Sequence, residues 1–283
     1  MNRENTISTE SLTLIDTHCH LNIMVKEEFD TPLFPAQVSA AQAIIGDAIR
    51  NHVTTIINVG TSLAESINSV TLAQQYKQVF ATIGIHPTDC TSQWQPDLQK
   101  LQALLIDRHK NKIVGIGECG IDLYHPGHNL QRQTDAFKAH IELALEYNLA
   151  LVIHSRNAAQ ETLKIIDSYK RDIKRATMHC FSYDQSIAND IIAMGYMIGI
   201  DAPITYKKNE ELRTIAATVP LEYIVLETDA PFLPPQEIRG QQNHPKYIKT
   251  IAQFIAELRN TTLEHIAAQT TINARALFNL DEY

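Results

Sequence analysis

The sequence has few cysteines and no long hydrophobic run, which excludes several classes of protein. No apolar stretch approaches the ~18 residues that cross a bilayer, and the polar opening MNRENTISTE lacks the apolar core of a signal peptide. The four cysteines, Cys19, Cys90, Cys119 and Cys180, form no C-x-x-C pair, which is typical of a reducing compartment. We therefore predict a cytoplasmic protein that neither spans nor binds a membrane.

An excess of positive charge is also missing. The chain has 24 Lys and Arg against 32 Asp and Glu, a formal net charge of −8. A surface that is basic throughout is excluded, so any contact with nucleic acid depends on a local cluster of Lys and Arg or on metal ions. Charge therefore neither favours nor excludes DNA.

The sequence does contain a regular alternation of short apolar runs with longer amphipathic segments. The predicted strands cover 13–16, 53–60, 79–87, 112–120, 149–155, 175–180, 196–200 and 222–229, and a helical pattern follows each of them. Eight such units in ~250 residues predict a closed (β/α)8 TIM barrel, and an open doubly wound sheet is the alternative. No linker divides the chain, so we predict one domain over residues 1–283, with one or two extra helices in 262–280 that cap or flank the barrel.

Candidate reactive side chains lie where the predicted strands give way to loops. They are His18 and His20 in the first unit, His86 in the third, Glu118 in the fourth, His154 in the fifth, His179 in the sixth, and Glu227 and Asp229 in the eighth. The carboxyl ends of parallel barrel strands converge on one face, and strand alternation points His18 and His20 to the axis while Cys19 points outward. We therefore expect these side chains to lie close together at the mouth formed by the carboxyl ends of the strands.

This joint pattern predicts a metal centre. One histidine at a strand end is more often a structural residue, and the helical His109, His140 and His265 look like ordinary surface residues. Facing imidazoles and carboxylates, however, are costly to bury without a cation. Six candidate ligands are too many for one tetrahedral ion and suit two ions roughly 3.5–4 Å apart with a bridging carboxylate, a pair that makes hydroxide available near neutral pH. Imidazole with carboxylate favours zinc, manganese or iron over magnesium.

Three cysteines directly follow candidate ligands. Strand alternation turns Cys19, Cys119 and Cys180 to the opposite face from those ligands. We therefore interpret them as small packing residues rather than thiolate ligands.

A series of segments resembles a known family. IDTHCHLN, IGIHP, GIGECGIDLY, LVIHSRNA, MHCFS, IGIDAPITYKKN, LETDAPFLPP and RGQQNHP resemble, in order, the motifs of the TatD family of metal-dependent deoxyribonucleases, from about Leu14 to Asn273. The resemblance implies a TIM barrel of the amidohydrolase-like hydrolases that cleaves DNA phosphodiesters, often from a 3′ end, with divalent ions. Magnesium is commonly invoked for the family, and we leave the ions open among magnesium, manganese and zinc.

Position by position, the resemblance also implies roles for residues. His18, His20 and Asp229 would hold one ion, Glu118 would bridge, and His154 and His179 would hold the other. Glu227 would position water or a ligand, and Asp229 would also move a proton from the attacking water toward the leaving group. The chain departs from the family pattern at Asn22, where Asp is common, at Tyr183, where Gly is usual, and at Asp201-Ala202-Pro203, which is usually glycine-containing. We expect these departures to lie near the mouth and to affect substrate choice.

Substrate contacts are predicted from cationic and aromatic residues near the strand ends. Arg156 and His86 are expected to contact phosphate, and Lys207, Lys208 and Arg239 add loop cations, with solvated surface charge as the alternative. Tyr124 and Phe181 are candidates to stack on a base, with core packing as the alternative.

Three functions fit these residues. The leading hypothesis is a two-metal nuclease that trims a 3′ end of single-stranded DNA without an obligate protein partner. A hydrolase of a small amide, lactone or phosphoester keeps the same site. A catalytically idle binding protein requires a lost ligand, and every expected ligand is present.

Overall fold

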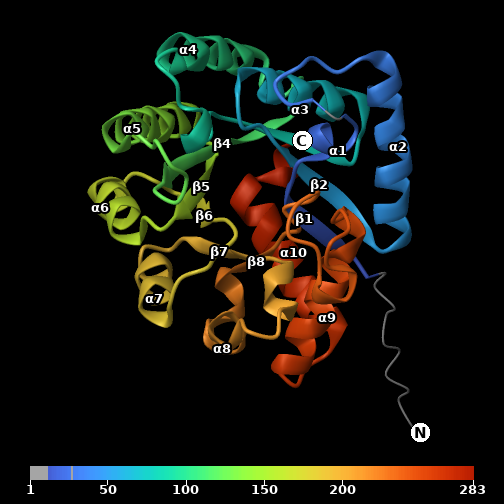
Figure 1. Cartoon of the computed structure of the whole chain (residues 1–283). Helices are drawn as coiled ribbons and strands as arrows, with labels where there is room; N and C mark the ends of the chain where they lie inside the picture. Colours follow the sequence, from blue (N-terminus) through green and yellow to red (C-terminus); the bar gives the residue numbers. More distant parts are fainter. Residues whose placement is uncertain (1–11, 27) are drawn as a thin grey trace, which may run out of the picture.

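The computed structural model describes residues 12–26 and 28–283, which alternate between strands and helices (Figure 1). The strands are β1 (Leu14–Cys19), β2 (Val53–Val59), β3 (Val79–Ile83), β4 (Ile113–Asp122), β5 (Ala150–Arg156), β6 (Ala176–Met178), β7 (Met197–Ile200) and β8 (Ile224–Leu226). The α-helices are α1 (Leu21–Met24), α2 (Pro35–Arg50), α3 (Leu63–Gln75), α4 (Trp94–Leu104), α5 (Leu130–Tyr147), α6 (Ala159–Tyr169), α7 (Gln185–Ala193), α8 (Glu210–Thr218), α9 (Ile248–Leu258) and α10 (Leu263–Phe278). Short 3-10 turns are η1 (Pro87–Asp89), η2 (Leu105–Asp107), η3 (Ala202–Thr205), η4 (Leu221–Tyr223), η5 (Gln236–Ile238), η6 (Pro245–Tyr247) and η7 (Leu280–Glu282).

The strands form a barrel in consecutive order. Each strand from β1 to β8 pairs in parallel with the next, without the reversal of order that a doubly wound sheet requires. The first and last strands meet just beyond β8, where the His20 amide donates to the Ala230 carbonyl at 2.7 Å and the Asp229 amide donates to the His18 carbonyl at 2.8 Å. The predicted (β/α)8 TIM barrel is therefore confirmed, and helices α2 to α9 ring the strands in Figure 1.

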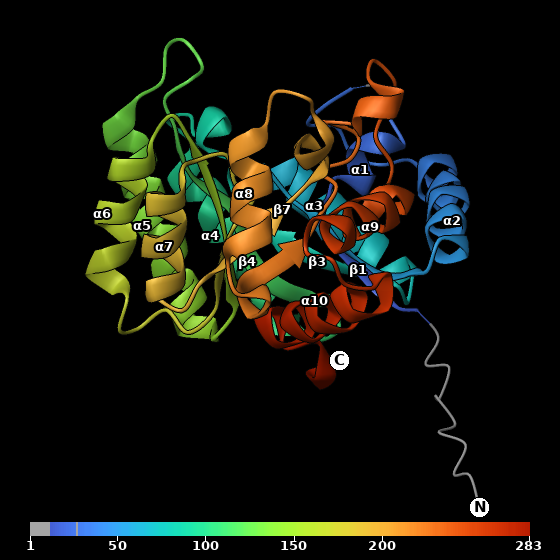
Figure 2. The ribbon, with the colours of Figure 1, turned by 90° about the horizontal axis from the view of Figure 1, so that it is seen from below.

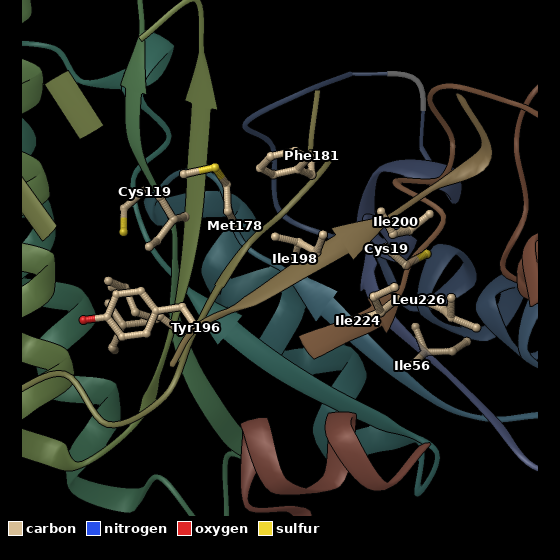
Figure 3. Close-up of a cluster of buried hydrophobic side chains, with 14 of the residues drawn as sticks. Cys19, Ile56, Cys119, Met178, Phe181, Tyr196, Ile198, Ile200, Ile224 and Leu226 are labelled. Atoms are coloured by element: carbon tan, nitrogen blue, oxygen red, sulfur yellow. The ribbon is translucent and has the colours of Figure 1, made fainter. Parts of the chain in front are cut away.

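The apolar core is divided between the two faces of the sheet. The larger part lies between strands and helices and includes Ile56, Ile198 and Leu226 together with Cys19 and Cys119 (Figure 3). Both thiols are buried, so these two cysteines pack as strand alternation predicts.

A second apolar cluster closes one end of the barrel. Ile15, Ile57 and Val152 point inward and pack against Leu277 and Phe278 of α10. Figure 2 shows α10 lying across this end, with the loops that follow the strands at the other. The extra C-terminal helix therefore caps the barrel, and chemistry is left to the opposite mouth.

Only β7 ends at the residue predicted for it: β1 runs past Asp16 to Cys19, β3 stops at Ile83 instead of Pro87, and the ends of β2 and β5 differ by one residue. Three further differences affect the candidate ligands. β4 continues four residues past Glu118 to Asp122, whereas β6 stops at Met178 and β8 stops at Leu226. As a result Glu118 lies within a strand, and the candidate ligands of the sixth and eighth units lie just beyond theirs. Among the described residues, no helix is long and apolar enough to cross a membrane.

Candidate metal centre

Six side chains from five strand ends converge at the open mouth. His18 and Glu118 lie in β1 and β4, and His154 lies in β5. His20 and His179 directly follow β1 and β6, and Asp229 is the third residue after β8. All are buried except His154, which is partly exposed. The structure therefore brings together every residue that the sequence assigned to the metal site.

One group of donors surrounds the Oε2 atom of Glu118. His18 Nε2 lies 3.3 Å from this oxygen and 3.2 Å from His20 Nε2. Asp229 Oδ1 lies 3.2 Å from His20 Nε2 and 3.7 Å from His18 Nε2. Two ligands at ~2.1 Å from one ion are themselves about 3.0–3.4 Å apart, so these four atoms are spaced as ligands of a common cation.

A second group surrounds the other oxygen of the same carboxylate. Glu118 Oε1 lies 2.7 Å from His154 Nδ1 and 2.7 Å from His179 Nε2, and these two nitrogens are 3.2 Å apart. Each Glu118 oxygen thus faces its own pair of imidazoles. This is the geometry of a bridging carboxylate between two ions.

Hydrogen bonds behind the histidines determine which ring nitrogens face the centre with a lone pair. His20 Nδ1 lies 3.2 Å from the Val59 carbonyl, and His154 Nε2 lies 3.0 Å from Asp122 Oδ2. A carbonyl and a carboxylate only accept hydrogen bonds, so these nitrogens carry protons in the neutral rings, and the lone pairs of the opposite nitrogens point at other acceptors. A proton or a cation must lie between them, so the residues fit metal binding.

The charges of the cluster agree with this requirement. Burial opposes ionisation of Glu118, but the surrounding imidazoles, His179 and His86 above all, hold its pKa well below the usual value. Burial disfavours the protonated form of His154, yet its bonds to Asp122 and Glu118 raise its pKa to about 9. Burial lowers the pKa of His18 to about 4. Without metal, one proton at His154 thus does part of the neutralising that a cation would do.

Glu227 lies behind the centre rather than in its mouth. Its Oε1 accepts the Cys180 amide and lies 3.7 Å from His179 Nδ1, and it does not line the cavity described below. Burial raises its pKa well above the usual value. A side chain at Gly199 would place its Cβ 2.3 Å from Glu227 Oε2, so the glycine makes room for this carboxyl group.

Asp122 is a functional candidate that the sequence reasoning missed. Besides holding His154, it accepts the amides of Tyr124 and His125 at 2.9 and 3.1 Å and lies 3.2 Å from the His125 ring. Burial opposes its ionisation, but these donors lower its pKa. A carboxylate that orients a metal-binding imidazole is a common outer partner. The sequence does contain a sign of this role. In GECGID, Asp122 lies four residues after Glu118, and residues an even number of positions apart in a strand point to the same face.

The metal centre forms the floor of a cavity of about 710 Å³. Of the predicted substrate contacts, His86, Arg156 and Phe181 line it. His86 Nε2 also lies 3.4 Å from Glu118 Oε1, close enough to count as a further candidate donor. Lys207, Lys208, Arg239 and Tyr124 are not among the lining residues. The Arg156 guanidinium instead stacks over the Tyr124 ring, with its Cζ atom 3.8 Å from the ring centroid. Arg239 covers the Tyr206 ring in the same way.

Asp201 is a second residue that the sequence reasoning did not assign. It is buried in the cavity lining, where the side chain of Cys180 interacts with its carboxylate. Burial raises its pKa to about 7. This departure from the family pattern does lie at the mouth, as expected.

Other expectations were wrong. His140 is buried rather than exposed, because its ring accepts the Ile85 amide and contacts the Ala136 carbonyl. Cys180 lines the cavity instead of facing away, because β6 has already ended and the residue has a left-handed φ of 46°.

Two of the three departures do not face the mouth. Asn22 is buried in α1 and donates to Glu65 at 2.8 Å. The Tyr183 hydroxyl accepts the Ala158 amide at 3.1 Å and bonds Ser155 at 2.8 Å. Phe181 is 1% exposed, which favours packing over base stacking.

A TIM barrel with imidazoles and carboxylates gathered at its carboxyl-end mouth defines a metal-dependent hydrolase. The chain belongs to the TatD related DNase family, whose family model matches residues 15–279. It is 32% identical over 268 residues to the "Uncharacterized metal-dependent hydrolase YabD" of Bacillus subtilis, which covers 95% of this chain and 100% of that protein.

Two further similarities concern named TatD proteins. The chain is 30% identical over 242 residues to the "3'-5' ssDNA/RNA exonuclease TatD" of Salmonella typhimurium, covering 84% of this chain and 92% of that protein. The crystal structure of YJJV, a TatD homolog from Escherichia coli K12, matches with a TM-score of 0.84 and 29% identity, covering 94% of this chain and 98% of that one.

Proposed function

We propose that the protein is a two-metal deoxyribonuclease that removes nucleotides from the 3′ end of single-stranded DNA. One observation carries the proposal: the two oxygens of Glu118 face separate groups of donors on the floor of a single cavity. The similarity to a relative named as a 3′-5′ exonuclease supports phosphodiesters as the substrate. The family model points to the same class.

We assign the two donor groups to two ions. His18, His20 and Asp229 would hold one ion, His154 and His179 would hold the other, and Glu118 would contribute one oxygen to each. Imidazole-rich sets favour zinc or manganese, and magnesium is the third candidate. When bound, such ions supply Lewis-acid charge and activate water near neutral pH.

The protein side chains then have separate tasks. Asp229, at the surface of the cavity, accepts the proton of the attacking water and returns it to the leaving oxygen. Arg156, stacked on Tyr124, presents a fixed cation to a phosphate oxygen. Glu227 acts as a positioning residue, since it lies beside the His179 ring and accepts the next backbone amide.

The cavity charge explains why metal is needed for such a substrate. Asp89, Asp122, Asp201 and Asp229 line it with Glu118, whereas Arg156 is the one Lys or Arg in the described lining. A phosphate anion is repelled by these carboxylates until cations are bound.

The test is release of mononucleotides from a single-stranded oligonucleotide with a free 3′ hydroxyl, using protein loaded with magnesium, manganese or zinc. Glu118→Ala is expected to reduce kcat/KM by more than the 10–100-fold typical of an outer partner and to lower the bound metal measured by elemental analysis. Glu264→Ala is the matched control, because Glu264 is exposed on α10 at the capped end. Absence of turnover with all three metals, or faster hydrolysis of a small ester or amide than of DNA, would contradict the proposal.

A further inference from the structure

The cavity has chemically different walls. In the closed strand order, β8 and β1 lie across the barrel from β4 and β5. The loop after β4 contributes His125 to the lining, and the last residue of β5 contributes Arg156. The segments after β1 and β8 contribute Ile23, Phe29 and Phe232 beside the candidate ligands His20 and Asp229, and no Lys or Arg from them is in the described lining.

Phe232 lies directly against the metal centre. Its ring packs edge-on against His20 with centroids 5.7 Å apart, and its amide donates to the Asp229 carbonyl at 2.8 Å. The side chain nevertheless remains 41% exposed. A ring held beside two candidate metal ligands, with much of its surface free, is available to whatever binds there.

Phe29 reaches the same cavity from a loop that is anchored from below. The Asp30 amide and the Lys26 ammonium each donate to Glu65 Oε1 at 2.7 Å, and Glu65 Oε2 accepts from Asn22 at 2.8 Å. The Asp30 backbone on one side of Phe29 and the Lys26 side chain on the other are thus tied to one buried carboxylate, while the Phe29 ring itself is 58% exposed. Asn22 belongs to this anchor because its amide donates where an aspartate would repel Glu65.

We propose that Phe29 and Phe232 form a base-binding subsite, which stacks the base of a nucleotide whose phosphate lies at the neighbouring metal centre. The inference rests on the proposed function and assigns its substrate a heterocyclic base. An apolar aromatic wall without cations does not hold the phosphate backbone, whereas every base has a flat face that stacks on such rings regardless of sequence. The other exposed ring nearby, Tyr124, is already covered by Arg156.

Binding of two compounds that differ only by the base tests this subsite. Calorimetry on the metal-loaded protein compares deoxyadenosine monophosphate with 2-deoxyribose 5-phosphate. The wild type is expected to bind the nucleotide about 5- to 150-fold more tightly, the range for one stacked base. Phe29→Ala and Phe232→Ala should each reduce this ratio severalfold with little change for the sugar phosphate, and Phe29→Trp should preserve it.

Phe34→Ala is the matched control, because Phe34 is 68% exposed but does not line the cavity. Phe232→Leu with a bound-metal measurement separates loss of stacking from damage to the metal centre. A wild-type ratio near one, no binding of either compound, or equal losses for both compounds overturns the subsite. If the affinity ratio of nucleotide to sugar phosphate depends on both rings but the protein cleaves no DNA, the subsite stands and the nuclease proposal is refuted. If the protein cleaves DNA but the affinity ratio is insensitive to both rings, the nuclease proposal stands and the subsite is refuted.

Discussion

His140 is a buried neutral histidine, and its protonation should oppose folding. Its Nε2 accepts the Ile85 amide at 3.0 Å, and its Nδ1 lies 2.7 Å from the Ala136 carbonyl, so the neutral ring uses one nitrogen as acceptor and the other as donor. Burial lowers the pKa from 6.5 to about 4. Protonation of Nε2 would remove the lone pair that receives the Ile85 amide.

The pKa shift determines both the sign and the size of the effect. Because the folded pKa lies below the unfolded one, the stabilising contribution of His140 is complete above pH 6.5 and is lost as the pH falls toward 4. Linkage between these two pKa values corresponds to a loss of about 2 kcal/mol in the free energy of unfolding between pH 7.5 and pH 5.

Urea unfolding of His140→Gln at the two pH values measures this contribution. A chelator keeps the protein metal-free, so that metal release does not add to the pH effect. The glutamine oxygen can accept the Ile85 amide, and we expect a cost of about 1 kcal/mol at pH 7.5. The further loss on going to pH 5 should be about 2 kcal/mol smaller than in the wild type.

The exposed helical residue His265 provides the control for this experiment. His265→Gln should lose as much stability between pH 7.5 and pH 5 as the wild type. If His140→Gln also keeps the full wild-type pH dependence, the reasoning about the buried ring is refuted.

Three further changes address the site and its supports. Asp122→Asn should weaken metal binding about 10–100-fold, because the amide no longer supplies a carboxylate to His154; metal titration with an unchanged affinity would contradict this. Arg156→Met should raise KM for DNA about tenfold or more with a smaller change in kcat, since a charge-assisted phosphate contact is lost; equal KM values would count against that contact. Asn22→Asp should lower the free energy of unfolding at pH 7.5 by about 2–4 kcal/mol, because it places a second carboxylate against buried Glu65; urea unfolding within 0.5 kcal/mol of the wild type, as for an ordinary surface substitution, would refute the anchor.

The fold and the clustering of the candidate metal-site residues were largely predictable because their signals are local. The alternation of apolar runs with helical segments predicts a parallel barrel, and a parallel barrel places the ends of its strands at one mouth. His18, Glu118 and His179 could therefore be grouped although they lie far apart in the chain. Their residue types then indicated a cation without any knowledge of distance.

The supports of the site were less predictable because they depend on where each strand ends and on what packs beneath each loop. Asp122 was missed because β4 continues past the predicted end at Gly120. Asn22 looked like a residue of the mouth, yet α1 turns it into the interior toward Glu65. Cys180 was expected to face away, but the chain leaves the strand geometry two residues earlier, at Met178.

By itself the sequence determined the class of fold, the ligand types and the strands that carry them, because hydrophobic period and donor chemistry are properties of short segments. Only the tertiary structure decided that Glu118 presents one oxygen to each of two donor groups and that Phe29 and Phe232 line one wall of the cavity. These relations arise when the barrel closes and brings Cys19 beside Ala230, 211 positions away. Contacts at that separation depend on strand register, twist and loop packing together, which no local pattern contains.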